Sequence, residues 1–90
     1  MDATLKKSLK ARAHHVKALL QLGNKGLTPA VIAETEVALL AHELIKVKLT
    51  GIERPDRVST ANTLSAELQA EVVQIIGSTV VLYRKKPKET

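Results

Sequence analysis

A glycine-bracketed loop, Gly23-Asn24-Lys25-Gly26, is the stretch of this sequence whose residue types and spacing could do chemistry. A sugar-phosphate backbone can approach a protein chain closely only where Cβ atoms are missing, and two glycines provide this. Thr28-Pro29 predicts a helix start directly afterwards, because threonine is a good N-cap and proline is preferred at the first helical position. The N–H groups and positive dipole end of such a helix attract phosphate. With Lys25 as a mobile charge and Asn24 as an amide donor, the pattern indicates a clamp for a nucleic-acid backbone.

A bland interpretation of the same loop competes with this one. KH domains hold single-stranded backbone with a G-x-x-G loop of this kind. Short motifs also match by chance, and a plain strand-to-helix turn uses glycine for its positive φ. The lysine inside the loop and the capped helix after it support the clamp, and both interpretations remain open.

The other residues capable of chemistry do not form a recognisable catalytic or metal-binding pattern. His14 and His15 are adjacent, so their side chains diverge on a helix, and with His42 they show no metal-ligand spacing. Glu34 and Glu36 are two residues apart and do not face each other. The chain has no cysteine, and no nucleophile is paired with a base. We therefore expect no enzyme activity, no metal and no cofactor.

Composition favours a basic, backbone-binding domain. The 90 residues include 14 Lys and Arg against 9 Asp and Glu, a net charge of +5, which suits nucleic acid, although it could equally serve only solubility. Tyr83 is the only aromatic residue, which argues against stacking bases on aromatic platforms. The N-terminus has no apolar region typical of a signal peptide, and no apolar run is long enough to span a membrane, so we expect a cytoplasmic protein.

Length and hydrophobic periodicity predict a single α/β domain over residues 1–90, with a polar tail at 85–90 and the order αβαβαββ. Helices are expected at 3–15, 28–42 and 55–69. Strands are expected at 16–22, 44–49, 71–76 and 79–84, in a mixed four-stranded sheet covered by helices on at least one face. Gly77-Ser78 predicts a type II′ hairpin turn that pairs Ile76 with Thr79 and Val72 with Tyr83.

Side-chain alternation predicts which residues face the helices. Ile45, Val47 and Leu49 share one face of their strand, and so do Val16, Ala18, Leu20 and Leu22 of the first strand. Helix 28–42 is expected to turn His42, among other residues, toward the sheet. Helix 55–69 is expected to turn Val58 toward the sheet in the same way. Lys46 and Lys48 then lie on the opposite face, where they form either an open basic surface or edge-strand guards against aggregation.

Several separated motifs, in order, resemble the CRM domain (chloroplast RNA splicing and ribosome maturation), in its single-domain bacterial YhbY-type form. These motifs are Ala13-His14-His15, the segment 22–29, the segment 42–48, 73–77 and Val81-Leu82-Tyr83-Arg84. The resemblance covers about residues 5–84, which it implies are the core of the domain. The resemblance implies a KH-like G-x-x-G loop on a fold similar to the C-terminal domain of translation initiation factor three. It also implies RNA binding and association with precursors of the large ribosomal subunit.

Taken together, these patterns predict an RNA-binding protein that contacts the RNA backbone of large-subunit ribosomal RNA during assembly. We expect a monomer that has neither a membrane nor a small-molecule substrate as a partner. The predicted contacts are Gly23, Asn24, Lys25 and Gly26 of the loop and the basic residues Lys10, Lys46, Lys48 and Arg84. The alternative is a protein-interaction module that docks on a ribosomal protein or another partner without RNA, through the first helix or an edge of the sheet.

Overall fold

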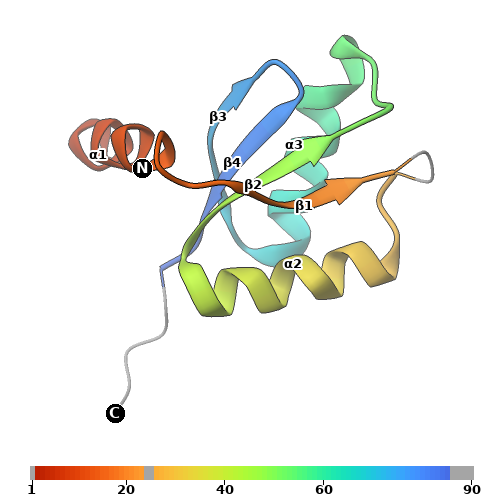
Figure 1. The fold of residues 1–90 in the computed structure, drawn as a ribbon, viewed down its shortest axis with the longest axis horizontal. Helices are drawn as coiled ribbons and strands as arrows, with labels where there is room; N and C mark the ends of the chain where they lie inside the picture. Colours follow the sequence, from red (N-terminus) through yellow and green to blue (C-terminus); the bar gives the residue numbers. More distant parts are fainter. Residues whose placement is uncertain (1, 24–25, 86–90) are drawn as a thin grey trace.

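The computed structural model describes residues 2–23 and 26–85, which fold into three helices and four strands in the predicted order αβαβαββ (Figure 1). The elements are α1 (Ala3–Ala13), β1 (Ala18–Leu22), α2 (Pro29–His42), β2 (Leu44–Leu49), α3 (Arg54–Leu68), β3 (Glu71–Ile76) and β4 (Thr79–Tyr83). The expected polar tail lies outside the described residues from position 86 onward.

The strands form one mixed sheet in the order β1-β2-β4-β3. β1 is parallel to β2, and β4 is antiparallel to both β2 and β3. The C-terminal ends of β1 and β2 and the β3–β4 turn therefore meet at one end of the sheet. β2 is an interior strand, with β1 and β3 at the edges, so the interpretation of Lys46 and Lys48 as edge-strand guards is wrong.

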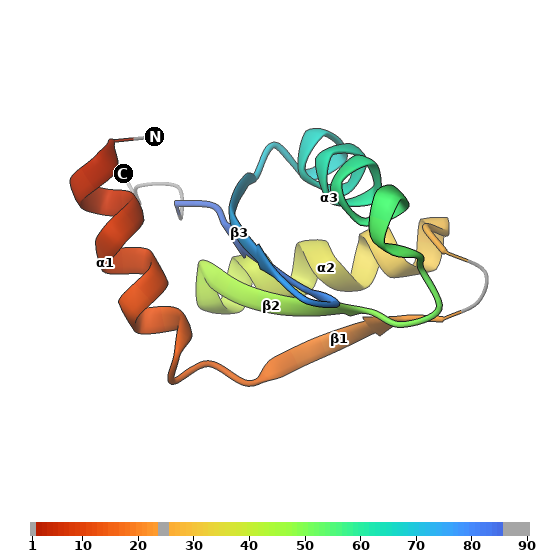
Figure 2. The same cartoon turned by 90° about the horizontal axis from the view of Figure 1, so that it is seen from above.

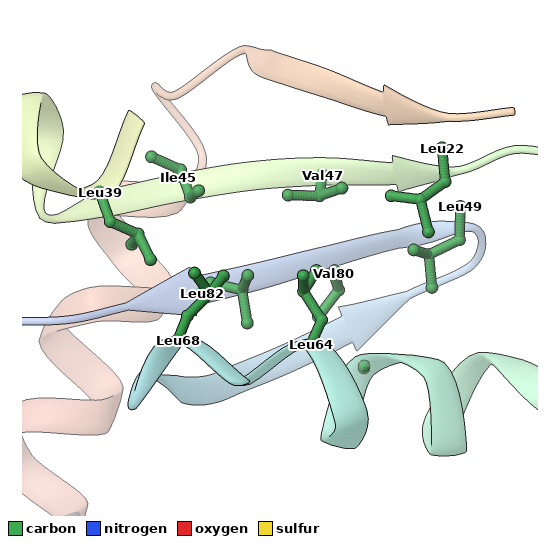
Figure 3. Packing of buried hydrophobic residues seen from close by; sticks show 10 residues of the cluster. Leu22, Leu39, Ile45, Val47, Leu49, Leu64, Leu68, Val80 and Leu82 are labelled. Atoms are coloured by element: carbon green, nitrogen blue, oxygen red, sulfur yellow. The ribbon is translucent and has the colours of Figure 1, made fainter. Parts of the chain in front are cut away.

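Helices α2 and α3 cover one face of the sheet, as Figure 2 shows, and the main core lies between them and the strands. The predicted alternation of β2 is confirmed there, because Ile45, Val47 and Leu49 are fully buried. Leu64 and Leu68 of α3 and Leu39 of α2 pack against these strands (Figure 3). Each fully buried leucine of this kind contributes about 1.5–3 kcal/mol of transfer free energy.

Helix α1 packs on the opposite face and covers only one end of it. Its buried residues Leu9 and Ala13 contact Leu44, Val73 and Val81 in a second, smaller cluster. α1 lies at the end of the sheet away from the C-terminal end of β1 (Figures 1 and 2). The remainder of this sheet face has no helix of the described chain over it.

Two β-bulges change which residues face each other. On β1, Ala18 pairs with Lys46 but Leu20 pairs with Val47, so Leu19 is an extra residue. Ala18 is therefore exposed on the face opposite the main core, and the prediction that it packs beside Leu20 is wrong.

The second bulge lies in the hairpin, whose turn is otherwise as predicted. Gly77 has φ of 56°, as a type II′ turn requires at its first central position, and Ile76 pairs with Thr79. A bulge between Val72 and Gln74 then shifts the register, so Val72 pairs with Leu82 instead of Tyr83. A turn sets the register only as far as the first irregularity in the ladder.

The predicted element ends differ from the observed ones by two residues or fewer, which is the usual uncertainty of helix and strand ends. α1 ends at Ala13, before His14 and His15, and β1 begins at Ala18. The prediction that His42 and Val58 turn inward is wrong. His42 is exposed at the last turn of α2, and Val58 is 55% exposed.

Candidate nucleic-acid interface

The glycine loop joins a buried strand end to a capped helix. Leu22, the last residue of β1, is fully buried, and it anchors the chain just before Gly23. The backbone N–H of Gly26 donates to the carbonyl of Gly23 at 3.0 Å, and Gly26 has φ of 67°. Apart from each glycine itself and its chain neighbours, no atom of the residues that the structure describes lies within 4 Å of where a Cβ would stand on either glycine. The two glycines therefore leave their outer side bare, while the predicted contacts Asn24 and Lys25 lie outside the described residues.

The N-terminus of α2 is built as the threonine-proline pattern predicts. Thr28 Oγ1 accepts a hydrogen bond from the N–H of Val31 at 3.2 Å, and its carbonyl accepts the first helical bond, from Ile32, at 3.0 Å. Pro29 occupies the first turn. This cap holds the positive end of the helix dipole two residues from Gly26.

The uncovered part of the sheet face carries both predicted strand lysines. One cross-strand row runs Gln21, Lys48, Thr79 and Ile76, and the next runs Ala18, Lys46, Val81 and Gln74. Lys48 is exposed and Lys46 is half-buried. We call the residues of these two rows the open face, leaving out Val81, which is buried under α1. Since Gln21 is two residues before Gly23, Lys48 lies on the strand next to the start of the glycine loop.

The remaining two predicted basic contacts are placed differently. Lys10 is exposed on α1. Arg84 is turned away from the open face: its guanidinium pairs with Glu36 of α2 and donates to the carbonyl of Leu68 at 2.9 Å. Only 19% of its side chain is exposed. The structure thus separates Arg84 from the lysines with which the sequence grouped it.

Sequence reasoning gave no role to α3, yet this helix forms one wall of a hollow beside Gly26. The hollow has a volume of about 430 Å³, and α3 contributes Asp56, Ser59, Thr60 and Thr63 to its lining. The hydroxyl groups recur at helical spacing, which is the only signal in the sequence that could have indicated this wall. Serine and threonine are weak helix formers, so helix propensity gives no indication of such a wall.

Other kinds of site find no support in the described part of the chain. Residues 2–23 and 26–85 contain no group of three His, Cys, Asp or Glu side chains arranged to hold a metal ion. Within those same ranges no helix is both long and apolar enough to cross a bilayer.

Fold and loop together define a class: a small α/β domain with a glycine-bracketed loop between an edge strand and a capped helix. A protein-family profile described as the CRS1/YhbY (CRM) domain matches residues 1–84. The chain belongs to this family, which confirms the resemblance noted in the sequence.

Similar proteins carry names that agree with this family. A "probable RNA-binding protein" of Pseudomonas aeruginosa is 47% identical over 92% of this chain and 80% of its own length. An "RNA-binding protein" of Haemophilus influenzae is 47% identical over 88% of this chain and 80% of its own length. The solution structure of a hypothetical protein from Staphylococcus aureus covers 100% of this chain and 94% of its own, with a TM-score of 0.86 and 31% identity.

Proposed function

We propose that this protein binds RNA by its sugar-phosphate backbone, at the glycine loop and the open face. The observation that carries the proposal is the bare loop at Gly23 and Gly26, set against the capped N-terminus of α2. A phosphate can approach such a surface without meeting a Cβ, and the helix dipole favours its charge. The RNA-binding names of the two 47% identical relatives support the same ligand.

The open face extends this contact along the backbone. Lys48 and Lys46 lie on neighbouring rows that lead away from the loop, and Lys25 and Asn24 would add contacts within it. Lys10 on α1 adds a further exposed charge. Because Tyr83, the one aromatic residue, is half-buried beside the α1 cluster, base stacking is not the main binding mode. Binding should therefore depend strongly on salt and weakly on sequence.

The RNA that we propose is large-subunit ribosomal RNA, bound in precursor particles during ribosome assembly in the cytoplasm. This target rests on membership of the CRS1/YhbY (CRM) family and on what the resemblance to the bacterial single-domain form implies. A backbone-binding monomer with no catalytic constellation would act by holding an RNA segment in place. Co-sedimentation with precursor large subunits on sucrose gradients tests the target, and equal association with small subunits would contradict it.

A pair of glycine substitutions tests the loop itself. Gly26 and Gly77 both have positive φ and open space around an added Cβ, so Gly26→Asp and Gly77→Asp carry similar backbone strain and the same added charge. Gly26→Asp should abolish filter binding of a ribosomal RNA fragment while circular dichroism shows a folded protein. Gly77→Asp lies beside Ile76 of the open face but outside the glycine loop, so it should weaken binding much less than Gly26→Asp does. Normal binding by Gly26→Asp refutes the clamp.

One observation favours a second function, as a protein-interaction module. Val37 and Leu40 on the outer side of α2 are 66% and 52% exposed, and such residues can dock a partner. Pull-down of assembly particles before and after complete RNase digestion separates the two functions. Retention of a partner protein after digestion supports protein docking, whereas its loss supports RNA binding.

A further inference from the structure

A second basic site lies at the end of β1 opposite the glycine loop. A hollow of about 380 Å³ is lined there by Arg12, His15, Lys17 and His42, with Leu19 and Leu44 among its apolar walls. The four basic side chains belong to exposed residues. They come from three parts of the chain: α1, the link between α1 and β1, and the last turn of α2. We call this site the basic corner.

The fold brings these residues together for clear physical reasons. α1 ends at Ala13, where its buried stripe meets Leu44 and Val81, and the chain then crosses to β1 through His15 and Lys17. α2 ends at His42, because Glu43 has φ of 59° and turns the chain into β2. Both turns therefore occur at the same end of the sheet.

Charge and donor chemistry indicate an anionic occupant. Among the described residues, the lining of the basic corner contains no carboxylate. Three other hollows, elsewhere on the described surface, each have at least one carboxylate in their lining. Glu43 is adjacent to His42 in the sequence but is not part of the lining. Arg12 offers a planar fork of N–H groups that matches a phosphate, Lys17 offers an ammonium group, and imidazoles add N–H donors.

The basic corner is continuous with the open face. Lys17 directly precedes Ala18, and Ala18 pairs with Lys46 across β1 and β2. From Lys17 to Gly23 the chain rises by at most about 20 Å, at roughly 3.3 Å per strand residue. Basic or polar side chains thus accompany the whole length of β1, from Lys17 through Lys46, Lys48 and Gln21 to the glycine loop.

We propose that the basic corner binds a second phosphate group of the same RNA strand that the glycine loop holds, with Arg12 and Lys17 as its main contacts. This inference rests on the proposed function. It has a consequence that a single loop contact lacks, because a G-x-x-G clamp contacts roughly four nucleotides. An RNA must extend well beyond that length to reach both sites, so affinity should increase when the oligonucleotide becomes long enough to span β1.

The test compares single-stranded oligonucleotides of 5 and 15 nucleotides by fluorescence anisotropy over a range of salt concentrations. Arg12→Ala/Lys17→Ala is the test variant. Lys6→Ala/Lys7→Ala is the matched control, since it removes two exposed charges from the same helix region outside the basic corner. For the 15-mer, the test variant should lose affinity and its salt slope should fall by about 1.4, at 0.7 for each lost phosphate contact. For the 5-mer it should match wild type, and the control variant should keep the wild-type slope with both.

The outcomes separate the two proposals. If wild type binds both oligonucleotides and the test variant equals it at both lengths, the basic corner is not a contact and the loop proposal stands. Equal losses at both lengths, or an equal loss in the control variant, would show a general effect of net charge and also overturn the inference. Failure of wild type to bind any RNA overturns the proposed function itself.

Discussion

The guanidinium of Arg84 is ion-paired with the carboxylate of Glu36, across the junction between the end of β4 and helix α2. The same nitrogen, Nη1, donates to the carbonyl of Leu68 at 2.9 Å. Leu68 is the last residue of α3, so this one side chain ties together α2, the C-terminus of α3 and the sheet. Arg84 thus has a structural role on the helix-covered side of the domain.

Replacing Arg84 should therefore affect folding more than RNA binding. Arg84→Ala removes a charge-assisted hydrogen bond to a helix-end carbonyl, and we expect a loss of about 1–3 kcal/mol in the free energy of unfolding. Urea unfolding followed by circular dichroism measures this loss. Glu36→Ala should cost less, because the Glu36 side chain is 44% exposed and the bond from Arg84 to Leu68 remains. Folded Arg84→Ala with wild-type stability but weakened RNA binding would reverse the assignment.

Lys48 should carry one phosphate contact on the open face. Lys48→Ala removes an exposed side chain from an interior strand, so we expect little change in stability. The slope of log affinity against log salt for single-stranded RNA should decrease in magnitude by about 0.7. Lys7→Ala, on the exposed side of α1, serves as the control and should keep the wild-type slope. A slope unchanged in Lys48→Ala would remove the open face from the RNA-binding surface.

Thr28 should stabilise α2 through its cap. Thr28→Ala leaves the N–H of Val31 without its side-chain acceptor and should lower the free energy of unfolding by about 1 kcal/mol. Thr63→Ala is the matched control, because Thr63 Oγ1 only donates to the carbonyl of Ser59 within the exposed part of α3. Its effect should be close to zero, since such bonds do not stabilise a helix interior. Thermal unfolding of both variants measures the two effects. Equal losses of stability in Thr28→Ala and Thr63→Ala would contradict a stabilising cap at Thr28.

The core between α3 and the sheet should tolerate truncation poorly. Leu64 is fully buried in the main core, and Leu64→Ala should cost about 2–5 kcal/mol, a large part of the stability of so small a domain. Leu40→Ala makes the same chemical change at a residue that is 52% exposed and should cost far less. Chemical denaturation of the two variants gives the comparison, and similar costs would mean that the packing in Figure 3 does not dominate stability.

Local patterns in the sequence were sufficient wherever one residue or a short period carries the information. The order of the elements, the ends of β2 and β3, the Thr28 cap and the inward face of β2 were all predicted correctly. Each depends on alternation, helical periodicity or the conformational preference of a residue at its own position. The glycine loop belongs to the same group, since its role as a turn before a helix is local.

Tertiary structure alone decided the features that depend on neighbours distant in the chain. The bulge at Leu19 moves Ala18 to the opposite face of the sheet, and the bulge at Val73 pairs Tyr83 with Glu71 instead of Val72. Alternation cannot indicate such an inserted residue. The sheet order makes β2 an interior strand and leaves Lys46 and Lys48 on the open face. Arg84 instead pairs with Glu36 on the helix-covered side of the sheet. The basic corner arises because two chain turns, 27 positions apart between His15 and His42, meet over one end of the sheet. Sequence by itself determined the elements and the loop. The grouping of charged residues on shared surfaces followed only from how the elements pack.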